Sequence, residues 1–150
     1  NLKTPSILSV GLARVFGSKG LITLQYDFTD FTNLKFNVGD GDRNFINQNN
    51  TIERSLKSAG TIKLGGEYRV SRLSFRAGYH NQQSINKKIK DENQGFSFGL
   101  GYDLGGSLIN IGVLNQKIER AELMYQEGLN QTINLKNAQT QFCIGLTIKL

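Results

Sequence analysis

The sequence predicts an all-β fold, an antiparallel up-and-down meander of about seven strands that forms the C-terminal half of a transmembrane β-barrel. Three observations lead to this prediction. Large apolar residues recur at every second position in about seven stretches of the chain. Short turns alternate with long polar loops. The positions between the apolar residues carry small, polar or charged side chains, as expected when one face of a barrel meets lipid and the other a polar lumen.

The alternating stretches define the predicted strands. In chain order they cover about 6–16, 20–36, 58–70, 72–81, 94–104, 107–119 and 137–150. The clearest is 94–104, where Phe96, Phe98, Leu100 and Tyr102 alternate with serine, glycine and aspartate. The stretch 116–128 also permits a short helix, but we favour strand extensions that join near 127–130.

The predicted connections differ in length at the two ends of the strands. Short turns fall at 17–20, 70–72 and 104–107, and long polar loops fall at about 37–57, 81–93 and 120–136. Short turns on one side and long loops on the other are typical of bacterial outer-membrane barrels, which have short periplasmic turns and longer external loops.

The face opposite the apolar rows separates two interpretations. A soluble sheet, as in a β-sandwich or a lipocalin-like barrel, would bury the apolar face and expose the polar one. The polar face here combines small residues with charges of both signs, which favours a membrane barrel with a polar lumen. The predicted lumen residues are Lys63, Glu67, Arg69, Arg76 and Asp103, with His80 at the outer rim and Lys149 at the inner end.

Aromatic residues gather at both ends of the predicted strands if the short turns face the periplasm. Tyr26, Phe28, Tyr79 and Phe96 fall at the outer ends, and Tyr68, Tyr102 and Phe16 fall at the inner ends. Two lipid-facing aromatic belts are expected at the two membrane interfaces, so this distribution predicts a location in the bacterial outer membrane.

Composition excludes several other classes. The net charge is +6, but the basic residues are scattered and interleaved with acids, so no nucleic-acid partner is predicted. The single Cys143 and single His80 provide no disulfide and no metal set. The segment 39–44 begins like a calcium loop but lacks its glycine and its bidentate glutamate. No nucleophile–base set is visible, so we predict neither an enzyme nor a cofactor.

The odd strand number predicts a fragment. Single-chain bacterial barrels have an even number of strands, from eight upward. A first strand that runs inward would also place residue 1 on the outer side. We therefore expect residues 1–150 to be the C-terminal part of one barrel domain, with the upstream half, a plug and a signal peptide missing.

The stretch 4–36 resembles the FadL family of outer-membrane transport proteins for hydrophobic compounds. Shared features are Pro5 before an inward strand, a short turn, and an outward strand with the aromatic run 26–31. The hairpin 67–79 and the final strand after a long loop also resemble the family. The resemblance implies a barrel of about fourteen strands. It further implies uptake of long-chain fatty acids or similar molecules with lateral exit through the wall, but carries over no ligand residue.

The lumen charges permit two roles. A cation such as Arg76 or Lys63 would bind a fatty-acid carboxylate, or Glu67 and Asp103 would pair with Arg69 and Arg76 as a structural network. A second function class is a scaffold or secretion-accessory barrel that binds a protein partner through its outer loops. A third is a soluble lipid-binding β-domain.

Overall fold

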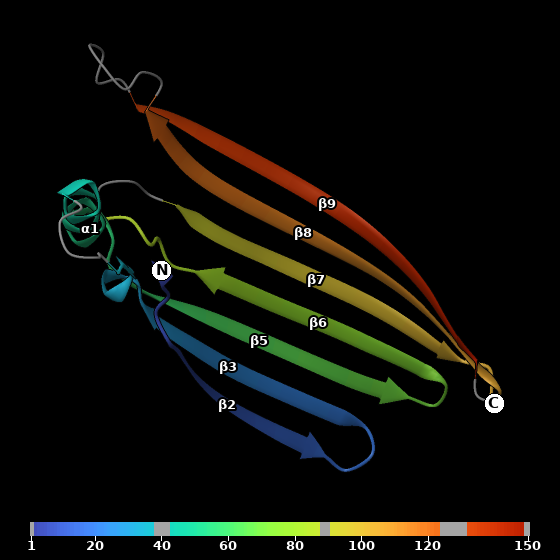
Figure 1. Cartoon of the computed structure of the whole chain (residues 1–150). Coiled ribbons are helices and arrows are strands. Elements are labelled where there is room, and N and C mark those ends of the chain that lie inside the picture. The colour runs from blue at the N-terminus through green and yellow to red at the C-terminus, as the bar shows by residue number, and fades with distance from the viewer. Residues whose placement is uncertain (1, 38–42, 88–90, 124–131, 149–150) are drawn as a thin grey trace.

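The computed structural model describes residues 2–37, 43–87, 91–123 and 132–148, and these form one large antiparallel sheet (Figure 1). Its seven strands lie side by side in the order β2-β3-β5-β6-β7-β8-β9. Their bounds are β2 Ile7–Phe16, β3 Gly20–Asp30, β5 Ser58–Val70, β6 Leu73–Gln82, β7 Glu92–Asp103, β8 Ser107–Leu123 and β9 Thr132–Ile148. The all-β meander of seven strands predicted from the sequence is therefore confirmed.

The last two strands are longer than predicted. β8 continues to Leu123 and β9 begins at Thr132, so the stretch from 116 to 123 is strand and not helix. The turn predicted at 127–130 lies outside the described residues. β7 begins at Glu92, which pairs with Glu119 on β8. Beyond that pair, residues 120–123 of β8 pair only with residues 132–135 of β9. The meander extends outward there as a two-stranded ribbon.

The segment after β3 differs from the prediction. The predicted strand 20–36 ends at Asp30, and a 3-10 turn, η1 (Phe31–Asn33), follows it. The short strand β4 (Lys35–Phe36) then pairs with β1 (Leu2–Lys3). The predicted polar loop 37–57 contains the 13-residue helix α1 (Arg43–Ser55), which lies at the end of the sheet away from the short turns (Figure 1). We call this end the outer end, after the orientation predicted from the sequence.

Specific side chains explain why this segment leaves the sheet. The Asp30 carboxylate accepts hydrogen bonds from the Thr32 N–H and O–H, and so caps η1. The Asn49 amide accepts from the Phe36 N–H at 2.8 Å and donates to the Phe36 carbonyl at 2.9 Å. The Phe36 ring also contacts the Phe45 ring in a tilted arrangement, with ring centroids 5.4 Å apart. These tertiary contacts, and not an apolar run, hold α1 against β4.

The short turns all lie at the opposite end of the sheet, which we call the inner end. Each contains one residue in the left-handed region: Gly17 with φ 58°, Ser71 with φ 55° and Gly105 with φ 90°. Ser71 and Arg72 form a two-residue loop between the paired residues Val70 and Leu73. A positive φ at the first loop residue matches the right-handed strand twist and favours glycine.

The sheet has almost no hydrophobic core within the described residues, where Ala59 is the one buried hydrophobic residue. Most of the large apolar side chains of the strands instead remain exposed on one face. Phe142 and Ile144 on β9 are 80% and 79% exposed. α1 packs against β4 and η1 at the outer end, so it does not supply a second layer over that face.

Candidate functional site

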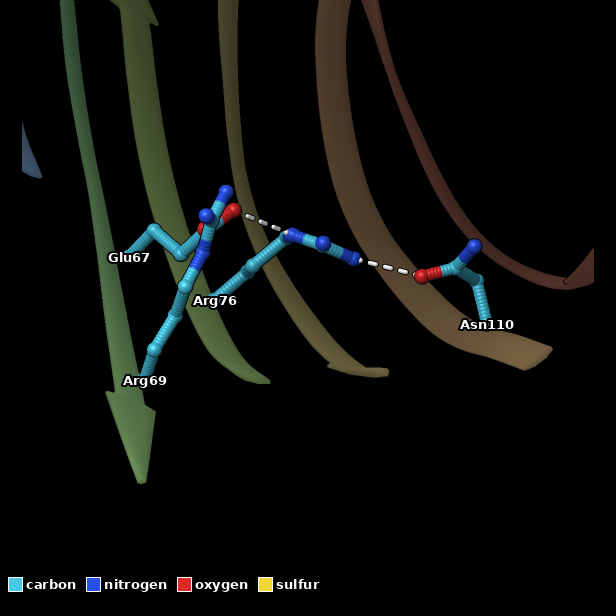
Figure 2. Close-up of polar contacts among 4 residues, drawn as sticks. All are labelled: Glu67, Arg69, Arg76 and Asn110. Carbon is cyan, nitrogen blue, oxygen red and sulfur yellow. Dashed lines mark hydrogen bonds and ion pairs between the residues drawn. The ribbon is translucent and has the colours of Figure 1, made fainter. Parts of the chain in front are cut away.

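The main polar cluster lies on the opposite face of the sheet, where three predicted lumen residues meet. Strand register places Glu67 on β5 directly opposite Arg76 on β6. Arg76 Nε donates to Glu67 Oε2 at 2.7 Å, and Arg69 Nε donates to Glu67 Oε1. Arg76 Nη1 donates to Asn110 Oδ1 on β8 at 2.7 Å (Figure 2). We call these four residues, Glu67, Arg69, Arg76 and Asn110, the arginine network.

Glycines on β7 make this network sterically feasible. Arg76 must cross β7 to reach β8, and its partner on β7 is Gly99. A Cβ at Gly101 would stand 2.9 Å from Asn110 Oδ1 and 3.3 Å from Arg76 Nη1. A side chain at this position would therefore displace the hydrogen bond. The glycine-rich sequence of β7 lets a long side chain lie flat over the strand.

A second polar cluster lies toward the outer end of the same face. Lys63 Nζ is 2.8 Å from Asp27 Oδ2, and Gln25 also donates to Asp27 at 2.8 Å. Further along the sheet, Asn93 Oδ1 accepts from Gln116 Nε2 at 2.8 Å and lies 3.4 Å from His80 Nε2. Lys63 thus belongs to a different cluster from Arg69 and Arg76.

The predicted lumen residues therefore divide among three places. Of the structural network predicted from the sequence, the part that pairs Glu67 with Arg69 on the same strand and with Arg76 on the next strand is present. Asp103 lies at the inner end of β7, where it accepts a hydrogen bond from the Gly105 N–H at 2.7 Å. Lys149 lies outside the described residues. The partners Asn110 and Asp27 were not selected from the sequence, because only strand register identifies them.

The electrostatics of the arginine network favour an anion over a cation. Two guanidinium groups share one carboxylate, so the cluster carries a net positive charge. The Glu67 side chain is 18% exposed, while the side chains of Arg76 and Arg69 are 37% and 61% exposed. Partly exposed ion pairs stabilise a fold by about 0–1 kcal/mol each, so a second carboxylate that replaced Glu67 as the partner of an arginine would lose little stabilising free energy. Among the described residues no group of three metal-ligating side chains occurs.

The aromatic residues of the apolar face keep a regular spacing. Tyr26 on β3 pairs with Ile62, which lies six positions before Tyr68 on β5. On β7, Tyr102 lies six positions after Phe96, whose ring centroid is 4.8 Å from that of Tyr79. When the strand register is followed from β3 and β5 to β7, the aromatic residue at each end of β7 lies two residues closer to the short turns than the corresponding aromatic residue of β3 or β5. Phe28, the remaining predicted belt residue, lies opposite Gly60 at the outer end.

Comparison with known proteins gives no identification: no family model, no curated protein and no solved structure matches the chain. In the described part of the chain, no helix is long and apolar enough to span a membrane. We therefore infer the function from the geometry of the two faces of the sheet.

Proposed function

We propose that the chain is a wall segment of a bacterial outer-membrane β-barrel that takes up hydrophobic small molecules such as long-chain fatty acids. Its apolar face contacts lipid, and its polar face lines the lumen. The observation that carries the proposal is the continuous apolar face, exposed from β2 to β9, opposite a polar face with paired charges.

The energetic cost of that apolar face in water supports the proposal. Burial of one large aliphatic or aromatic side chain contributes about 1.5–3 kcal/mol. Seven strands that leave such residues in water, with a single buried hydrophobic residue among the described ones, forgo most of this stabilisation. Lipid tails would provide the missing apolar contact without a second protein layer.

The spacing of the aromatic residues also agrees with a membrane barrel. Barrel strands tilt by about 35–45°, so a membrane plane crosses successive strands at stepped positions. The outer aromatic positions step inward from Tyr26 to Phe96, and the inner ones step inward from Tyr68 to Tyr102. An equal displacement of the outer and the inner aromatic residues is expected when the two parallel interfaces of a membrane cross the same tilted strands.

The strand directions specify what closure of the barrel requires. Six successive antiparallel pairings leave β2 and β9 running in the same direction. Direct pairing of these two edges would be parallel, whereas outer-membrane barrels are antiparallel. An odd number of additional strands restores antiparallel closure, and seven more would give the fourteen-stranded barrel that the FadL resemblance implies.

The arginine network supplies a candidate contact for an anionic head group in the lumen. A fatty-acid carboxylate would form charge-assisted hydrogen bonds with Arg69 and Arg76 in competition with Glu67. Lys63 would provide a second cation nearer the outer end, where it now pairs with Asp27.

Uptake of a labelled long-chain fatty acid by cells that produce the full-length protein tests this proposal. Uptake should depend on the protein, and the double variant Arg69→Gln/Arg76→Gln should reduce it severalfold. Lys136→Gln removes a different ion pair, with Glu119 on β8, and serves as the matched control. Uptake that is independent of the protein would refute the transport function.

A second candidate function is a scaffold that binds a protein partner at the outer end. It is favoured by contacts between the connection from β4 to β5, which contains α1, and the connection from β6 to β7. The Lys87 N–H donates to the Ser55 carbonyl, and Leu56 forms an isolated β-bridge with Asn86. A specific protein that co-purifies with the full-length chain, and is lost when α1 is replaced by a short linker, would support this function over transport.

A further inference from the structure

The apolar face contains a hollow of about 1080 Å³ that begins beside the β2–β3 turn and extends across the sheet to β9. Its floor is made of small residues. Gly66 on β5 lies opposite Ala77 on β6, between Ile22 on one side and Phe98 on the other. This volume is slightly above the roughly 300–1,000 Å³ of typical small-molecule pockets.

The floor of the hollow is open, although a glycine elsewhere on this face is covered. At Gly60 the Tyr26 ring occupies the space where a Cβ would stand. At Gly66 an added Cβ would meet only the Leu21 carbonyl oxygen, at 3.7 Å. No described side chain therefore fills the space above Gly66, and the lining of the hollow is almost entirely apolar.

Two cations mark the inner end of the hollow. Lys19 lines it directly, next to Phe16. The Arg14 guanidinium lies on the same face, 5.2 Å from the centroid of the Phe16 ring. Within the described residues neither cation forms an ion pair, whereas Lys63, Arg69 and Arg76 on the polar face all do. An apolar hollow with unpaired cations at its interfacial end complements a lipid with an anionic head group.

We propose that the hollow binds an acyl chain of an anionic phospholipid, whose phosphate contacts Lys19 and Arg14. The proposal rests on the assignment of the apolar face to lipid and adds a specific lipid to it. The acyl chain lies over Gly66 and Ala77, where it fills space that the neighbouring aromatic side chains leave open. The two cations fix the head group at the interface near the short turns.

The test uses the full-length protein, purified in a mild detergent and titrated with dioleoyl-phosphatidylglycerol or with dioleoyl-phosphatidylcholine. Native mass spectrometry measures the lipid bound to each molecule. We expect tighter binding of phosphatidylglycerol, and a loss of about fivefold in its affinity for each cation removed in Arg14→Gln and Lys19→Gln. Lys117→Gln removes a cation at the outer end of β8 and should leave binding unchanged.

Occupancy of the hollow is tested separately from the head group. Ala77→Leu fills the floor and should reduce binding of both lipids severalfold, while Val10→Leu adds a methylene to the same face outside the hollow and should not. Gly66→Ala is the second filling variant, because its added methyl group meets no side chain. Equal binding of the two lipids by the unaltered protein, or unchanged binding in Ala77→Leu and Gly66→Ala, would overturn the proposal.

Measurement of insertion into the bilayer distinguishes a refutation of this lipid site from a refutation of the proposed membrane barrel. A full-length protein that inserts and shows heat-modifiable gel mobility, but has no preference for phosphatidylglycerol, would refute only the lipid site. A protein that remains soluble without detergent would refute both the lipid site and the membrane barrel.

Discussion

Replacement of Leu100 by arginine places a charge in the middle of the apolar face. Leu100 lies on β7 between Phe75 on β6 and Ile111 on β8, and two positions from the inner aromatic residue Tyr102. On a lipid-facing barrel wall, an arginine near the bilayer midplane costs about 2–4 kcal/mol. We therefore expect Leu100→Arg to reduce assembly of the full-length protein in the outer membrane.

The size of the loss in stability distinguishes a lipid-facing from a water-facing surface, because Leu100 is 42% exposed and its side chain meets whatever covers this face. On a sheet face in contact with water, a substitution at such a position would change the free energy of unfolding by about 0.5 kcal/mol or less. Urea unfolding of the protein folded into vesicles measures the difference directly. Heat-modifiable gel mobility reports assembly in cells.

The control places the same charge on the other face. Gln141 on β9 faces the polar side of the sheet opposite Leu114. Gln141→Arg should assemble normally, since lumen positions accept charged side chains. Wild-type stability and membrane assembly of Leu100→Arg would refute the assignment of the apolar face to lipid.

Three further predictions concern local geometry. Gly101→Val should displace the bond between Arg76 and Asn110 and destabilise the folded protein by about 1–3 kcal/mol, measured by urea unfolding; an unchanged midpoint would contradict the steric argument. Ser71→Gly should raise the free energy of unfolding by up to about 1 kcal/mol, because glycine adopts the positive φ of this turn without strain. Asn49→Ala should release α1 from the two backbone hydrogen bonds of β4 and speed proteolysis within 43–55, while cleavage within the sheet stays constant.

The strands could be predicted because their signal is local. Alternation of apolar and polar residues identified β5 at 58–70 with its observed bounds, and it assigned each side chain to one of the two faces. The glycines and polar residues at the short turns also marked where each hairpin reverses. The helix α1 was missed because its asparagine-rich sequence has few apolar residues. Its position depends on contacts that Asn49 and Phe45 make with Phe36 on β4, the short strand directly before it.

The sequence by itself determined the strand order and the two faces, since side-chain direction alternates with a period of two along any strand. Only the tertiary structure decided which polar residues meet. Register places Glu67 opposite Arg76, and the glycines of β7 let Arg76 reach Asn110, 34 positions away along the chain. The hollow over Gly66 and Ala77 is likewise a product of register, because two small residues form a floor only when pairing sets them side by side. Such contacts depend on distances between strands, which no local pattern in the sequence encodes.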